Sequence, residues 1–78
     1  MHIVYILYSF SIEQYYCGET ANLIDRLSHH NAGRSKSTKR GIPWELVKVI
    51  ECKNSSEARV LEKQIKGRGI KRWLEDNS

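Results

Sequence analysis

The sequence is poor in cysteine and contains no long apolar run, and both shortages exclude classes of protein. Its two cysteines, Cys17 and Cys52, fall in β-like segments with no C-x-x-C or Cys/His ligand spacing around them, so a structural zinc site is not expected. Two buried, unpaired thiols suit a reducing compartment, which favours a cytoplasmic protein. No apolar run approaches the roughly 18 residues of a membrane span, so we expect no membrane association.

Two catalytic devices are also missing. The sequence has no Gly-rich segment that could cradle a phosphate, and no Ser/His/Asp or Cys/His spacing typical of an activated nucleophile. A covalent mechanism is therefore not indicated.

The size and charge of the chain are informative in a positive sense. With 78 residues, of which 40% are hydrophobic, the chain is predicted to form a single domain over residues 1–78 with a small core. Thirteen Lys and Arg against nine Asp and Glu give a net charge of +4, which favours a polyanionic partner. A basic surface that serves solubility alone would have the same charge.

Three segments have the composition of β-strands. Residues 3–8 are rich in β-branched and aromatic side chains and apolar on both faces, so we expect this strand in the middle of a sheet. Residues 15–18 form a second short strand after a polar connection. Residues 44–52 alternate well enough for a third strand, which is expected to place Trp44, Leu46 and Ile50 on one face.

Three helices are expected as well. Asn22 can cap the first, with Asp25 in its first turn, and Asn54 can cap the second, for which Gly67 is the expected end. A last short helix covers residues 68–76. The buried stripe of the first helix is expected to contain Leu23, Ile24 and Leu27. The order β-β-α-β-α-α predicts an α/β (α+β) domain with a three-stranded, mainly antiparallel sheet flanked by helices.

Five dispersed polar side chains are the types that metal-assisted phosphodiester cleavage requires: a phenolic base, a guanidinium for phosphate, an imidazole and a metal-binding carboxylate. They are Tyr5, Tyr16, Arg26, His30 and Glu62. Arg26 and His30 are one helical turn apart and share a side of the first helix. Each residue also has an ordinary explanation, because strand tyrosines pack, helix-end histidines stabilise the dipole, and single charges are usually solvated.

A basic segment separates the first helix from the third strand. Within residues 33–43 four positive charges occur without an acidic residue, namely Arg34, Lys36, Lys39 and Arg40. The composition predicts a mobile basic loop, which fits phosphate contact and a plain solvated loop equally well.

With these motifs in place, residues 3–74 resemble the GIY-YIG nuclease family, and within it the small stand-alone bacterial members. Residues 3–5 (Ile-Val-Tyr) stand where the family has Gly-Ile-Tyr, and residues 16–18 (Tyr-Cys-Gly) stand at its Tyr-Ile-Gly. The helical Arg and His and the late Glu of the family match as well. The sequence departs from the pattern in three places: Ile3 replaces the glycine of the first signature, Glu19 replaces a lysine common in repair-type members, and Asn77 is the sole candidate for a late asparagine.

The resemblance implies a DNA endonuclease that uses Mg²⁺ or Mn²⁺ bound by Glu62. Arg26 would contact the scissile phosphate, Tyr16 is favoured as the base with Tyr5 as a positioner, and His30 would activate a tyrosine or hold a phosphate. Further substrate contacts are expected from Gly18, Lys36, Thr38, Lys39, Arg40 and Lys66. The expected substrate is branched, flapped or single-stranded DNA, with RNA as a second candidate.

Two other functions remain open at this point. The same fold and basic surface could serve as a nucleic-acid-binding module with negligible turnover, which would need no metal. Alternatively, the protein could guide a larger nuclease, in which case we expect an exposed apolar patch around Trp73 and Leu74.

Overall fold

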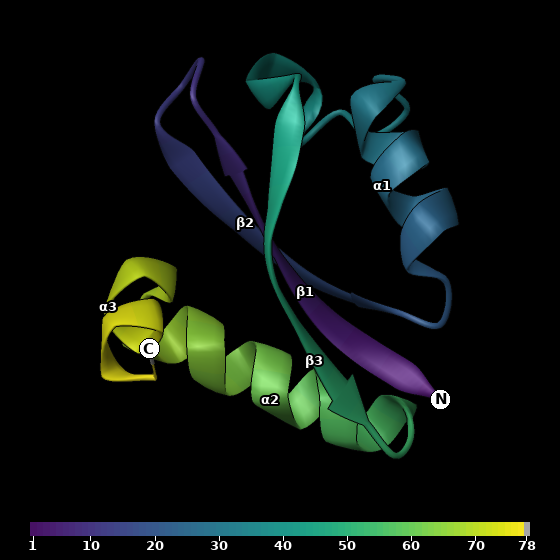
Figure 1. The fold of residues 1–78 in the computed structure, drawn as a ribbon, viewed down its shortest axis with the longest axis vertical. Coiled ribbons are helices and arrows are strands. Elements are labelled where there is room, and N and C mark those ends of the chain that lie inside the picture. The colour runs from purple at the N-terminus through teal and green to yellow at the C-terminus, as the bar shows by residue number, and fades with distance from the viewer. Residues whose placement is uncertain (78) are drawn as a thin grey trace.

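The computed structural model describes residues 1–77 and confirms the predicted element order and α+β architecture (Figure 1). Its strands and helices are β1 (His2–Ser9), β2 (Gln14–Thr20), α1 (Leu23–Asn31), β3 (Trp44–Cys52), α2 (Ser55–Arg68) and α3 (Ile70–Asp76), with a short 3₁₀ turn at Lys39–Gly41. The three strands of the described region form one sheet in the order β2-β1-β3, and both pairings are antiparallel.

The central position of β1 follows from its sequence. Val4, Tyr5, Ile6 and Leu7 are all fully buried, which is possible only when both faces of a strand are covered. β2 and β3 lie on either side of it and are the edge strands of the sheet. The prediction of a central first strand is therefore confirmed.

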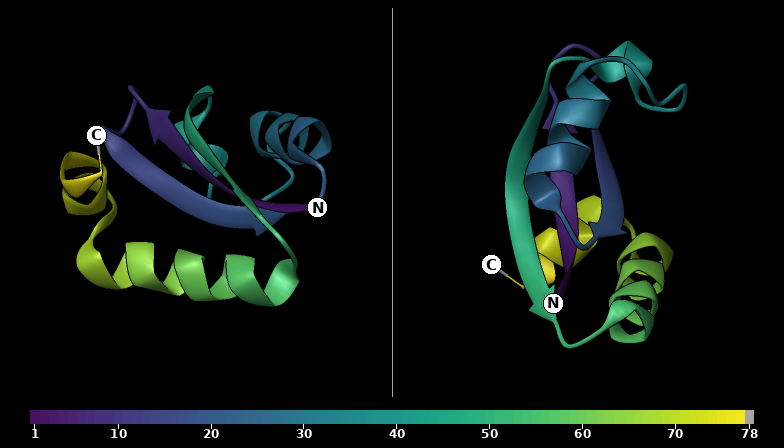
Figure 2. Two further views of the ribbon diagram at one scale, coloured as in Figure 1. Left: turned by 60° about the horizontal axis from the view of Figure 1, so that its bottom comes forward. Right: turned by 90° about the vertical axis from the view of Figure 1, so that its right-hand side faces the viewer.

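Helices cover the two faces of the sheet separately (Figure 2). On one face α1 packs Leu23 and Leu27 against Tyr5 and Leu7. On the other face α2 and α3 cover the even-numbered side chains of β1; their contributions include Ala58, Leu61, Ile65, Ile70, Trp73 and Leu74. β1 thus separates two small apolar clusters, and β2 is an edge between the two helical layers.

The expected alternation of β3 is wrong in its second half. The register shifts between Ile6 and Leu7, because Lys48 lies opposite Ile6 while Leu46 lies opposite Leu7. The additional residue, Val47, is a β-bulge, and a bulge reverses which face the following side chains occupy. Trp44 therefore packs in the α1 cluster, whereas Ile50 packs in the α2 cluster.

Both predicted N-caps are confirmed. The Asn22 side chain accepts a hydrogen bond from the backbone N–H of Asp25, and Asn54 does the same for Glu57. The predicted apolar stripe of α1 is wrong at Ile24, which is 82% exposed.

The predicted end of α2 is also wrong. Gly67 continues the helix, and Gly69 ends it with a φ of 95°, in the region that favours glycine. α3 accordingly starts at Ile70 and not at residue 68. At 14 residues α2 is the longest helix of the described region, and none of its helices is long and apolar enough to span a bilayer.

Candidate active site

The five predicted catalytic residues come from four elements of the fold. Tyr5 belongs to β1, Tyr16 to β2, Arg26 and His30 to α1, and Glu62 to α2. The Tyr5 hydroxyl lies 3.0 Å from Nε2 of His30. The rings of Tyr16 and His30 are 4.9 Å apart between centroids, and those of Tyr5 and Tyr16 are 6.3 Å apart. Residues separated by 25 positions in the chain therefore form one polar cluster.

Gly18 creates the space that Tyr5 occupies. The two residues are opposite each other in the β1–β2 pairing. A Cβ atom at position 18 would lie 2.5 Å from the Tyr5 hydroxyl oxygen, which is far inside van der Waals contact. The glycine thus allows the close approach of a tyrosine ring of its own chain.

The Tyr5 hydroxyl lies in an environment of opposing charges. Burial and the neighbouring Tyr16 raise its pKa to about 12, and the Glu62 carboxylate acts in the same direction. A hydrogen bond and the positive charge from Arg26 lower the pKa of Tyr5. Tyr5 is therefore a neutral phenol that interacts with a guanidinium.

His30 is part of the protein interior and not a solvated helix-end residue. It is 2% exposed, and its second ring nitrogen, Nδ1, lies 2.8 Å from the hydroxyl oxygen of Thr38. Burial lowers the pKa of His30, and the charges of Arg26 and His29 act in the same direction. Its imidazole is accordingly neutral near pH 7, with one nitrogen as donor and the other as acceptor.

On the other side of the β2 edge, Glu62 and Lys66 form an ion pair one turn apart on α2. The Lys66 ammonium lies 2.6 Å from Oε2 of Glu62, and this hydrogen bond raises the pKa of Lys66. The same ammonium is 5.9 Å from the centre of the Tyr16 ring. Glu62 raises the pKa values of both Tyr5 and Cys17, whose side chains lie on opposite faces of the sheet, so its carboxylate acts at the edge between them.

A divalent cation at this site would have a single carboxylate ligand, that of Glu62. Among residues 1–77 no group of three or more His, Cys, Asp or Glu side chains is arranged to hold a metal ion. The Glu62 side chain is 21% exposed and binds an ammonium, so its carboxylate is within reach of a cation. One carboxylate suffices for Mg²⁺ when water and a substrate phosphate complete the coordination. The donor set fits a weakly held, hard cation.

The basic loop divides into exposed and buried residues. Lys36, Lys39 and Arg40 are exposed, as a phosphate-binding role requires. Thr38 is fully buried, and its hydroxyl contacts His30 in place of solvent. The expectation of a direct substrate contact from Thr38 is therefore wrong, because its side chain has no free surface to offer.

Asn31 has a structural role that the sequence did not predict. Its side chain accepts a hydrogen bond from the Trp44 backbone N–H at 2.7 Å and donates one to the Trp44 carbonyl at 3.2 Å. These two bonds fix the end of α1 to the start of β3 and so hold the helix that carries His30. An asparagine in the last turn of a helix before a loop was the available signal.

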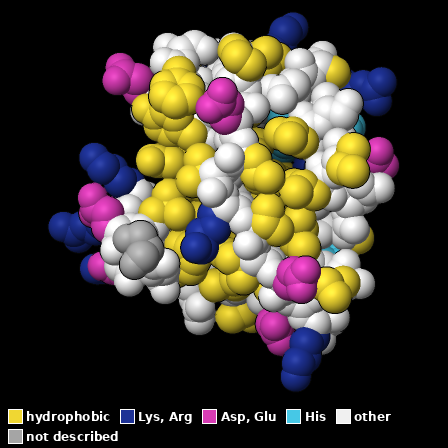
Figure 3. All heavy atoms as spheres, in the orientation of Figure 1, with side chains coloured by type: hydrophobic (Ala, Val, Ile, Leu, Met, Phe, Trp, Pro, Cys, Tyr) yellow, Lys and Arg dark blue, Asp and Glu magenta, His cyan; other side chains and the backbone are white. Residues whose placement is uncertain are grey.

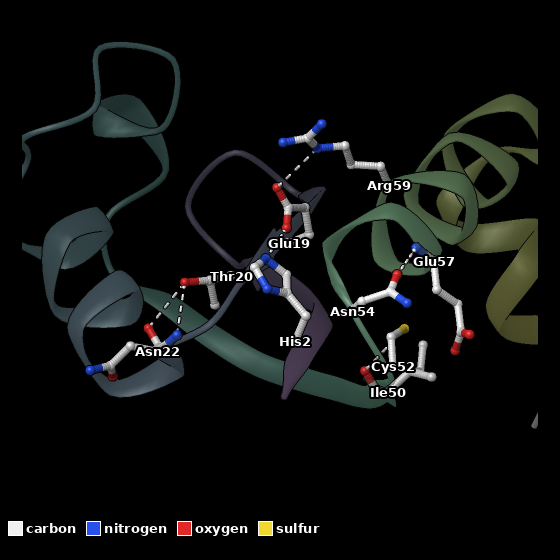
Figure 4. Close-up of polar contacts among 9 residues, drawn as sticks. All are labelled: His2, Glu19, Thr20, Asn22, Ile50, Cys52, Asn54, Glu57 and Arg59. Carbon is white, nitrogen blue, oxygen red and sulfur yellow. Dashed lines mark hydrogen bonds and ion pairs between the residues drawn. The ribbon is translucent and has the colours of Figure 1, made fainter.

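Glu19 occupies the position next to Gly18 where a lysine was expected from the resemblance. Its carboxylate lies between His2 and Arg59 (Figure 4). A cavity of about 450 Å³ opens beside it and reaches Arg26. Of the five candidate catalytic residues Arg26 alone lines this cavity, which has mixed charge because Asp25 also faces it.

Comparison with known protein families agrees with this geometry. A family model of the GIY-YIG catalytic domain matches residues 1–73 of the 78-residue chain. No curated protein and no solved structure matches the chain. Since the match spans both tyrosine signatures, the helical Arg and His, and the late Glu, the chain belongs to the GIY-YIG family of nucleases.

Proposed function

We propose that this protein is a metal-dependent endonuclease that hydrolyses phosphodiester bonds in DNA and leaves a 5′-phosphate and a 3′-hydroxyl. The observation that supports it most directly is the cluster of two phenols and an imidazole, with a guanidinium and a carboxylate whose charges act on the Tyr5 hydroxyl. Hydrolysis of a phosphodiester requires an oriented water, a base for its proton and stabilisation of charge on the phosphoryl oxygens. These side chains can supply each of them.

Tyr16 is the better placed of the two phenols to act as the base. Tyr5 is fully buried, while Tyr16 keeps part of its surface exposed and lies near the Lys66 ammonium. A water can reach Tyr16 more easily than the buried Tyr5. Tyr5 would then act as a positioner and would transmit the electrostatic effect of Arg26 to the site.

Arg26 is proposed to bind the scissile phosphate. It is exposed and borders the open cavity, and a planar guanidinium can donate two parallel hydrogen bonds to phosphate oxygens. Mg²⁺ or Mn²⁺ bound by Glu62 would supply positive charge at the leaving 3′-oxygen.

The basic loop and Lys66 are proposed as contacts to the DNA backbone. Lys36, Lys39 and Arg40 project from the loop after α1, and Lys66 projects from α2. Contacts of this kind position a nucleic acid without identifying its bases. A chain of this size offers little surface for sequence readout, so we propose branched, flapped or single-stranded DNA as the substrate class.

A second candidate function is binding of DNA or RNA without turnover, which the basic surface would support. The alternative that the protein guides a larger nuclease loses its predicted evidence, an exposed apolar patch around Trp73 and Leu74, since both side chains pack against the core. Exposed apolar side chains lie instead on β3, at Leu46, Val47 and Val49. Figure 3 shows a broad hydrophobic area on the face of the molecule that β3 crosses.

The experiment that separates nuclease from binding module uses labelled single-stranded, flapped, branched and plasmid DNA, and a matched RNA strand. Each is incubated with Mg²⁺, with Mn²⁺ or with EDTA. We expect discrete products with 5′-phosphate ends from at least one DNA substrate, and none in EDTA. Binding to every substrate without products in either metal would contradict the proposal and favour the binding module.

A further inference from the structure

Thr38 is the one polar side chain of the basic loop that is fully buried, and it contacts an active-site residue. We propose that Thr38 is a positioning residue that holds His30 in the Nδ1–H tautomer, so that Nε2 is free to accept a hydrogen bond from the Tyr5 hydroxyl. The hydrogen-bond chain would run from Tyr5 through His30 to Thr38. This inference deepens the proposed function and rests on it for its catalytic meaning.

The first argument for the tautomer comes from the Thr38 end of the chain. A threonine hydroxyl has one proton to donate. The geometry directs that proton toward the backbone carbonyl of Ser35, at an oxygen–oxygen distance of 3.5 Å. The oxygen is then an acceptor for His30, 2.8 Å away, so Nδ1 must carry the hydrogen.

The second argument comes from the Tyr5 end and does not depend on the first. Tyr5 is fully buried, so the single proton of its hydroxyl needs an acceptor inside the protein. Nε2 of His30, at 3.0 Å, is that acceptor. Both ends of the chain indicate the same tautomer.

The loop holds Thr38 through its backbone as well. The Thr38 carbonyl accepts hydrogen bonds from the Trp44 indole N–H, at 2.6 Å, and from the backbone N–H of Gly41, at 3.1 Å. Lys39 and Arg40 follow directly in the 3₁₀ turn. The segment expected to touch the DNA backbone is thus continuous with the group that orients His30. Contact with DNA would fix both together.

The decisive experiment is NMR of the uniformly ¹⁵N-labelled wild-type protein. Long-range ¹H–¹⁵N correlations from the imidazole ring identify which nitrogen carries the proton. We expect His30 as the Nδ1–H tautomer at neutral pH. A proton on Nε2 of His30 would overturn the proposal whether or not the protein cleaves DNA.

Three variants then connect the tautomer to catalysis. Thr38→Val removes the acceptor with little change in size, Thr38→Ser retains it, and Ser37→Ala is a matched control at an exposed position of the same loop. We expect Thr38→Val to lower kcat by about 10-fold to 100-fold at nearly constant KM, as for other partners that orient a functional histidine. Thr38→Ser and Ser37→Ala should cleave like the wild type.

The outcomes are separable. In Thr38→Val the His30 spectrum should show the Nε2–H tautomer or a mixture, a change that loosening of the loop alone would not produce. An unchanged spectrum with unchanged kcat would refute the positioning role. If Thr38→Val does not fold, the wild-type and Thr38→Ser spectra still decide the tautomer. If the wild-type protein cleaves no substrate, the proposed function fails while the tautomer assignment stands or falls on its own spectrum.

Discussion

On the α1 side of the β2 edge the functional groups are buried and hydrogen bonded to one another, whereas on the α2 side Glu62 and Lys66 form a partly exposed ion pair. Tyr5, His30 and Thr38 are at most 2% exposed. The Glu62 and Lys66 side chains are 21% and 49% exposed. One half of the site is built into the core, and the other half faces water.

The energetics of the two halves differ accordingly. A buried donor or acceptor that loses its partner costs about 1–3 kcal/mol, so the chain through His30 is held in one arrangement. An exposed ion pair contributes about 1 kcal/mol or less, so it can be exchanged for another cation at little cost. The difference teaches that the hydrogen-bond chain is preorganised here, while the proposed metal and phosphate positions would stay open until their ligands bind.

The largest expected effect comes from Glu62→Ala. Loss of the proposed metal-binding carboxylate should reduce cleavage by at least about 10³-fold, since it would remove charge stabilisation that acts in the transition state. The melting temperature should change little, because the pair with Lys66 is exposed. Single-turnover cleavage, binding at fixed salt and thermal melting of the same preparation measure the three quantities.

Lys63→Ala, at an exposed position of the same helix, is the matched control and should retain cleavage. Undiminished cleavage by Glu62→Ala would refute the metal assignment. A large loss of stability in that variant would break the comparison itself, because it would show that the α2 half is also a structural part of the fold.

A pair of glycine-to-alanine variants, one beside Tyr5 and one in α2, compares the two halves of the site through changes in the backbone. Gly18→Ala places a methyl group against the Tyr5 hydroxyl, and a misplacement of about 1 Å can reduce cleavage on the order of 10²-fold. Overpacking should also cost about 1–3 kcal/mol of unfolding free energy. Gly67→Ala meets no described atom within 4 Å and should stabilise α2 by about 0.5–1 kcal/mol without affecting cleavage.

Cleavage assays and urea unfolding of both glycine variants test this prediction. A Gly18→Ala protein with normal cleavage would mean that Tyr5 is not held where the structure has it. The effect of Gly67→Ala has the opposite sign in stability, so a general fault of preparation could not produce both results.

The sequence was sufficient for the element order, the central β1 and both helix N-caps, because these depend on local pattern. It failed where a single residue altered the register or the backbone. The bulge at Val47 moved Ile50 to the other face of the sheet, and no alternation pattern shows an inserted residue in advance. The end of α2 was misplaced because two glycines, Gly67 and Gly69, were equally good candidates by composition.

At the site, residue types indicated the chemistry but not the contacts. Tyr5 and His30 were predicted separately, and their bond depends on tertiary packing across 25 positions. Thr38 was grouped with the lysines beside it, since nothing in its sequence neighbourhood distinguishes a buried hydroxyl from an exposed one. Position 38 becomes interpretable only when the loop is seen to fold back over α1.

The smallest expected effect is a pH dependence of stability that originates in the buried half. Burial, with Arg26 and His29, lowers the pKa of His30 below its ordinary value of 6.5, so the unfolded chain binds this proton more tightly than the folded one. The stability that neutral His30 contributes is therefore complete above that ordinary value and is lost as the pH falls through the folded pKa. Melting temperatures measured between about pH 7.5 and pH 5.5 should fall toward the acidic end.

His30→Gln should reduce this acid sensitivity, because a glutamine at the same place does not titrate. His29→Gln, at the exposed neighbouring position, should keep most of it. Since the exposed Glu62–Lys66 pair contributes little to stability, removal of Lys66 as Lys66→Met should leave the slope unchanged. An equally steep acid slope in His30→Gln would assign the effect to other groups and would remove the distinction between a fixed proton-handling half and an exchangeable ligand-binding half.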